Sequence, residues 1–131
     1  MIVVDSNIVA YLYLPGDQTA AAERLLLREP EWAAPLLWRS EMRNVLASHI
    51  RQRRLDFERA FEIQREAEAL MADNEYDVDS FDVLELARDS GCTAYDCEFI
   101  ALARRLGTKL FTQDTKLRKA FPKLTAALSR T

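Results

Sequence analysis

A single acidic residue inside an apolar helical pattern constrains this chain more than any other feature. The stretch Ala94–Ala103 reads as the start of a helix, and Asp96 lies within it. The apolar stripe of this helix is expected to be Phe99, Ile100, Ala103 and Leu106. Helical periodicity therefore puts the Asp96 carboxylate on the core-facing side. Because an unpaired buried carboxylate is strongly destabilising, the rest of the fold must supply something that compensates it.

Size and composition indicate an ordinary globular protein. The 131 residues suit one domain spanning 1–131, and 49% of them are hydrophobic and 30% charged. The net charge of -3 gives no global positive field for nucleic acid. Asp5 follows too closely on the N-terminus for a signal peptide, and no apolar run approaches the ~20 residues of a membrane span. Cys92 and Cys97 lack the partners of a zinc site, so we expect a reduced, cytoplasmic protein.

Short strand patterns alternate with helical patterns along the chain. The expected strands are residues 2–4, 31–35, 76–78 and 109–112, and residues 124–128 fit either a strand or a frayed helix. The expected helices are residues 8–14, 18–28, 36–53, 56–71, 81–88, 94–106 and 115–120, with Ser6 or Asn7 capping the first. This alternation predicts an α/β sandwich around a mostly parallel sheet.

Two apolar patterns carry further expectations. Residues 56–71 are expected to turn an apolar stripe toward the core, consisting of Phe57, Ala60, Phe61, Gln64, Ala67 and Met71. The first two helices carry more apolar side chains than one side of a sheet needs, namely Tyr11, Tyr13, Leu14, Leu25, Leu26 and Leu27. An exposed patch of that kind is typical of an interface with another protein.

Four acidic residues stand at positions where a parallel sheet brings ligands together. Ligands of open parallel sheets bind beyond the carboxyl ends of the strands. Asp5 and Asp114 each follow a predicted strand, Asp96 lies in the first turn of its helix, and Glu41 flanks the apolar face of the 36–53 helix. Taken singly, each acid is explained as a helix cap, a turn residue or a surface acid.

The four acids together are harder to explain as separate structural residues. Two carboxylates about 4 Å apart repel by roughly 1 to 4 kcal/mol, so a cluster without a counter-ion is costly. Mg²⁺ and Mn²⁺ prefer oxygen ligands, and Mg²⁺ usually keeps waters or substrate oxygens in its remaining positions. If the acids converge, the sequence therefore favours a divalent-metal site.

Four segments of the chain give it a family resemblance. They are Ile2-Val3-Val4-Asp5-Ser6-Asn7, Glu41 in the third helix, Tyr95-Asp96 with Phe99-Ile100-Ala101-Leu102-Ala103, and Leu110-Phe111-Thr112-Gln113-Asp114-Thr115-Lys116-Leu117. In this order and spacing the chain resembles a PIN domain, the small nuclease fold of VapC-type toxins. The resemblance implies a PIN-like three-layer α/β/α sandwich around a short, mostly parallel sheet.

The resemblance also implies a function. It implies an Mg²⁺- or Mn²⁺-dependent endoribonuclease whose acidic quartet is Asp5, Glu41, Asp96 and Asp114. Asp5, Asp96 and Asp114 are then the direct metal ligands, and Glu41 acts through a water or holds a second ion. Ser6 and Thr112 match supporting hydroxyl positions, and Asn7 matches a neighbour in the first segment. The same resemblance implies a homodimer and an antitoxin protein that covers the acidic site.

Lesser features leave alternatives open. Lys116, Arg118 and Lys119 follow the last acid and are candidates for RNA phosphate contacts, at even odds with a solvated face. His49, on the apolar stripe of its helix, is interpreted as a core or rim residue. A haloacid-dehalogenase-like phosphotransferase needs an acid two residues after Asp5, where Asn7 stands. A non-catalytic PIN relative that only binds RNA or a protein remains the alternative.

Overall fold

The parallel sheet predicted from the sequence is confirmed in a computed structural model that describes residues 1–129. Within that range five short strands pair in the order β3-β2-β1-β4-β5, and every pairing is parallel. The strands are β1 (Ile2–Val4), β2 (Trp32–Pro35), β3 (Glu75–Tyr76), β4 (Leu110–Phe111) and β5 (Thr125–Ala126). Residues 124–128, which the sequence left open, thus contain a strand.

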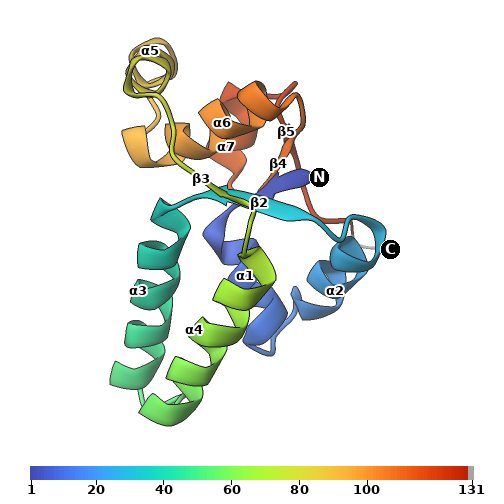
Figure 1. Ribbon diagram of the computed structural model, residues 1–131, viewed down its shortest axis with the longest axis vertical. Coiled ribbons are helices and arrows are strands. Elements are labelled where there is room, and N and C mark those ends of the chain that lie inside the picture. The colour runs from blue at the N-terminus through green and yellow to red at the C-terminus, as the bar shows by residue number, and fades with distance from the viewer. Residues whose placement is uncertain (130–131) are drawn as a thin grey trace.

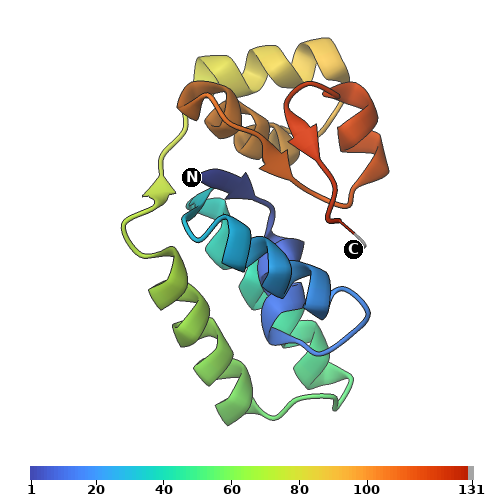
Figure 2. The same cartoon turned by 90° about the vertical axis from the view of Figure 1, so that its right-hand side faces the viewer.

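Helices cover both faces of this sheet, which makes three layers (Figures 1 and 2). One face carries α1 (Ser6–Tyr13), α2 (Thr19–Arg28), α3 (Leu37–Arg51) and α4 (Phe57–Met71). The other carries α6 (Ala94–Leu106) and α7 (Thr115–Ala120), with α5 (Ser80–Ser90) packed on α6. Because both faces are covered, β1 reads as a continuous apolar run whose side chains are at most 5% exposed.

The strand order reverses at β1. The chain runs outward from β1 through β2 to β3 and then returns to place β4 on the other side of β1. A crevice opens at such a reversal, beyond the carboxyl ends of the two strands that flank it. Asp5 directly follows β1, and Asp114 lies three residues after β4. The topology therefore directs both acids to one crevice.

Helix ends follow the local sequence, with one correction. Asp5, and neither Ser6 nor Asn7, caps α1, because its Oδ1 accepts from the backbone N–H of Asn7 at 2.8 Å and of Ile8 at 3.2 Å. The predicted stops of α5 and α6 are confirmed. Gly91 (φ 73°) and Gly107 (φ 66°) adopt the left-handed conformation that ends a helix at little cost only for glycine.

Both apolar patterns were partly misassigned. On α4, Ala60, Gln64, Ala67 and Met71 are buried as expected, but Phe57 and Phe61 are 66% and 56% exposed and stack on each other. The expected exposed patch on α1 and α2 is mostly covered. Leu25 is fully buried, and four further side chains pack against the core, namely Tyr11, Tyr13, Leu14 and Leu26. Of the six residues of the expected patch, only Leu27 is strongly exposed, at 85%. The four-helix layer covers these side chains, which helical periodicity alone does not reveal.

None of the helices in residues 1–129 combines the length and the apolar character needed to cross a membrane.

A partly buried polar junction anchors α3 to the sheet edge. Glu75 on β3 accepts from Arg39 Nε at 2.6 Å, from Arg39 Nη2 at 2.7 Å and from the indole N–H of the fully buried Trp38 at 2.7 Å. Arg39 also donates to Glu68 of α4 at 3.1 Å. The junction thus fixes the start of α3, the helix that carries Glu41.

Replacing Glu75 tests this junction. The hydrogen bonds from Arg39 hold the pKa of the Glu75 carboxyl below its usual 4.5, so the stability they provide is present above pH 4.5 and is lost as the pH falls through the lowered value. Glu75→Gln is expected to lower the free energy of unfolding at pH 7 by about 1.5–3 kcal/mol. Urea unfolding at several pH values should show the deficit shrinking below pH 4.5. A deficit independent of pH, or one shared by the control Glu23→Gln on exposed α2 surface, contradicts the assignment.

Candidate active site

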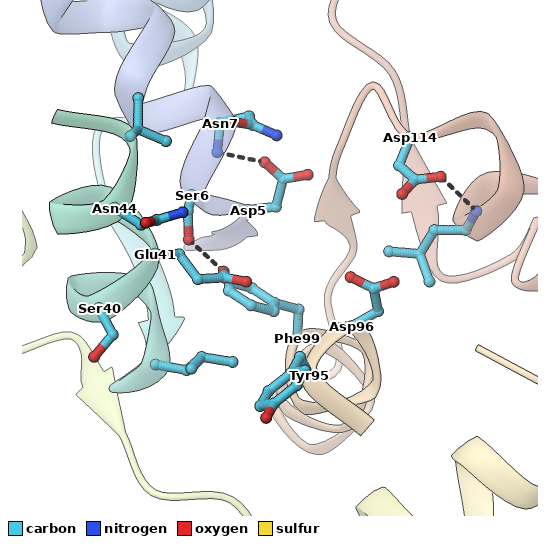
Figure 3. A pocket seen from close by; sticks show the side chains of 13 residues that line it. Asp5, Ser6, Asn7, Ser40, Glu41, Asn44, Tyr95, Asp96, Phe99 and Asp114 are labelled. Atoms are coloured by element: carbon cyan, nitrogen blue, oxygen red, sulfur yellow. Dashed lines mark hydrogen bonds between the residues drawn. The ribbon is translucent and has the colours of Figure 1, made fainter. Parts of the chain in front are cut away.

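The acidic quartet lines one pocket. A cavity of about 450 Å³ opens at the reversal of the sheet, and its wall includes Asp5, Glu41, Asp96 and Asp114. We call it the acidic pocket. Figure 3 shows the four carboxylates facing a common space, Asp5 and Glu41 from the side of α1 and α3, Asp96 and Asp114 from the side of α6 and α7. Four residues far apart in sequence are thus brought together from four elements.

Thr112 connects two of the acids. Its side chain is fully buried and its hydroxyl donates to Asp5 Oδ2, while the backbone N–H of Asp114 donates to the same hydroxyl oxygen at 3.1 Å. The other oxygen of Asp5 caps α1. Asp114 in turn caps α7, its Oδ1 accepting from the backbone N–H of Leu117 at 3.1 Å. Both acids therefore have their structural role as caps and lie in the pocket as well.

Ser6 fixes Glu41. The Ser6 hydroxyl is buried and donates to Glu41 Oε1 at 2.7 Å, a contact between the first turn of α1 and the second turn of α3. Asn7, the remaining predicted neighbour, also lines the pocket. The three supporting residues named from the sequence thus lie beside the quartet, and all of them donate to its carboxylates, Ser6 and Thr112 through their hydroxyls and Asn7 through its backbone N–H.

Asp96 differs from the other three acids. Its backbone N–H donates to the capping Thr93, but within residues 1–129 no protein donor contacts its carboxylate. The expectation that this side chain faces the core is wrong in part: it is half-buried on the pocket wall, while the adjacent Cys97 and the following Phe99 and Ile100 are buried. The half-buried carboxylate faces the open pocket, and no cation from residues 1–129 contacts it.

The pocket raises the pKa of two carboxyls. Burial raises the pKa of Asp5, hydrogen bonds from Thr112, Ile8 and Asn7 oppose the rise, and the charge of Asp114 adds to it. Burial also raises the pKa of Glu41, against the bond from Ser6, and the charges of Asp5, Asp96 and Glu98 add to the rise. Carboxylates that disfavour their own ionised form in this way gain from a bound cation.

The donor set fits a hard divalent cation. Every acidic group in the wall offers oxygen, and among residues 1–129 neither Lys nor Arg lines the cavity. No three His, Cys, Asp or Glu side chains in the described chain lie close enough to hold an ion alone. This spacing agrees with Mg²⁺, which is usually bound by one or two carboxylates with waters and phosphate oxygens in its other positions. Soft or strongly coordinating metals prefer closed sites of thiolate and imidazole, which this pocket lacks.

The pocket contains residues that sequence reasoning did not single out. Ser40, directly before Glu41, and Asn44, one turn after it, line the pocket, and so does the buried Phe99, which was assigned only to the core. Helical spacing from Glu41 would have found Asn44. The basic candidates Lys116, Arg118 and Lys119 lie on α7 outside the lining, with Lys116 and Lys119 exposed and Arg118 half-buried. His49 is a half-buried rim residue whose Nδ1 lies 3.0 Å from the Val45 carbonyl oxygen.

Comparison with known proteins gives a consistent result. Residues 2–121 match the family model described as PIN domain. The chain is 31% identical over 136 aligned positions to Ribonuclease VapC3 from Pyrobaculum aerophilum, an alignment that covers 94% of this chain and 96% of that protein.

Two solved structures share the fold. The crystal structure of PAE2754 from Pyrobaculum aerophilum superposes with a TM-score of 0.78 at 22% identity, covering 97% of this chain and 88% of that one. A toxin–antitoxin complex from Klebsiella pneumoniae gives a TM-score of 0.72 at 17% identity and covers both chains completely. At these identities the two likenesses establish the architecture.

Neutralising Glu41 is expected to stabilise the metal-free protein. The pKa of Glu41 is raised in the folded state, so its ionisation costs stability as the pH rises above 4.5. The cost grows until the pH has passed the folded-state pKa and is constant beyond it. Glu41→Gln keeps an acceptor for Ser6 and removes the charge. In EDTA at pH 7 we expect a gain of roughly 0.5–2 kcal/mol in the free energy of unfolding, the usual range for relief at a functional site.

Thermal unfolding at pH 7 and pH 4 measures this effect. The gain should disappear at pH 4, where the wild-type carboxyl is largely protonated in both states. A Glu41→Gln protein that is less stable than the wild type at pH 7 contradicts the electrostatic reading of the pocket.

Proposed function

Because the chain belongs to the PIN domain family, we propose that it is a metal-dependent endoribonuclease that hydrolyses RNA phosphodiester bonds. The observation that carries the proposal is the convergence of four carboxylates in one pocket, whose lining contains no cationic side chain from the described part of the chain. The similarity to Ribonuclease VapC3 supports RNA as the substrate. We further propose that the protein is the cytoplasmic toxin of a toxin–antitoxin pair.

Each residue of the site has a proposed role. Asp5, Asp96 and Asp114 would hold one or two Mg²⁺ or Mn²⁺ ions together with waters or phosphate oxygens, and Glu41 would act through a water or hold a second ion. Such an ion supplies charge neutralisation for the phosphate, a more acidic water and stabilisation of the leaving oxygen. Hydrolysis forms a bond from water oxygen to phosphorus and breaks a phosphorus–oxygen bond of the chain. Ser6 and Thr112 orient Glu41 and Asp5 through the hydrogen bonds described above.

Partners follow from the same proposal. The toxin–antitoxin complex among the structural neighbours supports an antitoxin protein as partner. An acidic pocket open to solvent suits a cationic side chain from that partner, which would neutralise the quartet in place of a metal ion. A homodimer is proposed as well; the exposed Phe57 and Phe61 of α4 and Phe81 of α5 offer apolar surface for contacts of these kinds.

Removing the Asp96 charge tests the catalytic proposal. Asp96→Asn takes away the one carboxylate of the quartet that no protein donor contacts, and it leaves the α6 cap at Thr93 intact. RNA cleavage by the wild type is expected with Mg²⁺ and Mn²⁺ and not with EDTA. The variant should cut at least roughly 100-fold more slowly than the wild type, because loss of a charge-stabilising group lowers kcat on this scale.

A thermal-shift titration with Mg²⁺ separates the alternatives. The wild type should be stabilised by the ion, and Asp96→Asn should be stabilised less. A wild type that neither cuts RNA nor responds to metal favours the non-catalytic reading, in which the protein binds RNA or a partner. Full metal-dependent cleavage by Asp96→Asn refutes the assigned role of this residue.

The basic residues of α7 give a separate prediction. If Lys116 and Arg118 contact RNA phosphates, reversing both charges weakens binding to RNA of any sequence and lowers the slope of log K against log salt by about one per lost contact. Fluorescence anisotropy at several salt concentrations with EDTA measures both. An unchanged slope in the double variant assigns α7 to a solvated face.

A further inference from the structure

A second cavity adjoins the acidic pocket. It has a volume of about 260 Å³ and lies between α1 and α3, with Asn7, Tyr11, Leu14, Pro15, Val45 and His49 in its wall. We call it the side pocket. Asn7 and Val45 line both cavities, so the two hollows share a boundary. The acidic pocket therefore continues along α1 and α3 into a second compartment.

The two compartments differ in chemistry. Four acids line the first, whereas none of the residues that line the side pocket is Asp, Glu, Lys or Arg. Its wall is a phenol ring, an imidazole, the amide of Asn7 and four apolar side chains, namely Ala10, Leu14, Pro15 and Val45. A metal-bound phosphate suits the first compartment. A neutral, planar group with a polar edge suits the second.

The surroundings of His49 fix which nitrogen is free. Nδ1 lies 3.0 Å from the Val45 carbonyl oxygen, and a carbonyl can only accept, so Nδ1 carries the proton. In the neutral ring Nε2 is then an acceptor, and within residues 1–129 it has no protein partner. His49 thus offers one hydrogen bond to a ligand, beside the ring of Tyr11.

We propose that the side pocket binds the base of the nucleotide adjacent to the scissile phosphate, with Tyr11 as the aromatic contact and His49 and Asn7 as the polar ones. Proteins recognise single-stranded RNA by stacking splayed bases on aromatic rings and by hydrogen bonds to base edges. The proposal rests on the proposed function, because it takes the scissile phosphate to lie in the acidic pocket. A partner protein is the weaker occupant, since the cavity is small, has no charged residue from the described chain in its lining and adjoins the acidic pocket at Asn7 and Val45.

His49 provides a direct probe, since it is the only histidine in the sequence. Its imidazole Cε1–H gives one NMR resonance, which can be followed at constant pH. The titrants are the tetranucleotides rA4, rC4 and rU4, and an abasic ribose–phosphate tetramer as control. Each is added to the Asp96→Asn protein with Mg²⁺ and to the wild type with EDTA. We expect at least one tetranucleotide to shift the resonance saturably and the abasic tetramer to leave it in place.

Variants give an independent readout with a matched control. Tyr11→Leu removes the ring from the side pocket, and Tyr13→Leu makes the same change two residues further along α1, outside both cavities. Tyr11→Leu should weaken binding of the tetranucleotide that shifts His49 by about 5- to 150-fold, the range for loss of one base–aromatic contact. Binding of the abasic tetramer should not change, and Tyr13→Leu should bind as the wild type does. In cleavage assays Tyr11→Leu should raise KM more than it lowers kcat.

The outcomes separate this proposal from the proposed function. Two results overturn the base-binding role if the wild type still cuts RNA: no RNA moves the His49 resonance, or Tyr11→Leu and Tyr13→Leu have equal effects. Either result leaves the nuclease proposal standing and assigns the side pocket to a partner protein. A shift by the abasic tetramer equal to that by RNA also overturns it, because the backbone is then the ligand. A base-dependent shift without cleavage supports RNA recognition and counts against catalysis.

Discussion

The parallel pairing of β1 with β4 is the constraint on which the site depends. Val3 and Val4 register with Leu110 and Phe111, and the pairing continues through the bond from the Asp5 N–H to the Phe111 carbonyl at 3.2 Å. Asp5 and Thr112 therefore leave the sheet side by side, where the Thr112 hydroxyl can reach the Asp5 carboxylate. A shift of one residue would turn one of these side chains to the opposite face of the sheet and separate them. The burial of β1 on both faces makes such a shift costly.

In the acidic quartet, residues with a structural role are also residues for which we propose a catalytic one. Asp5 and Asp114 are helix caps, and capping is worth about 1 kcal/mol in general, yet the same carboxylates crowd one pocket with Glu41 and Asp96. The caps and the hydroxyls of Ser6 and Thr112 hold the carboxylates in place without neutralising them. Fixed, mutually repelling charges are poised for a cation and cost stability without one, which is the usual tension between stability and activity at a functional site.

The two cavities extend this division of labour along α1 and α3. These helices pack against each other over a common stretch, and the residues between them change from acidic near the sheet to aromatic and apolar farther away. RNA has the same alternation, since a charged phosphate is followed by a largely uncharged nucleoside. Under the proposed function, a groove whose character changes over one nucleotide would suit an RNA chain without a basic field, in keeping with the net charge of -3.

The sequence by itself determined the alternation of strands and helices and the parallel sheet, and it singled out the four acids that the structure brings into one pocket. These follow from local patterns, such as the apolar run that ends at Asp5 and the glycines that stop α5 and α6, and from a family resemblance that covers most of the chain. Only the tertiary structure decided which faces are covered. Helical periodicity predicted that Phe57 and Phe61 face the core and that apolar residues of α1 and α2 form an exposed patch. In the structure both Phe side chains are exposed, and most of the α1–α2 apolar residues are covered in the layer of four helices. The same holds for the pockets. Asp96 lies half-buried with no protein donor to its carboxylate among residues 1–129, and Tyr11 and His49 line one cavity. Both facts depend on contacts between residues distant in sequence, which no local pattern encodes.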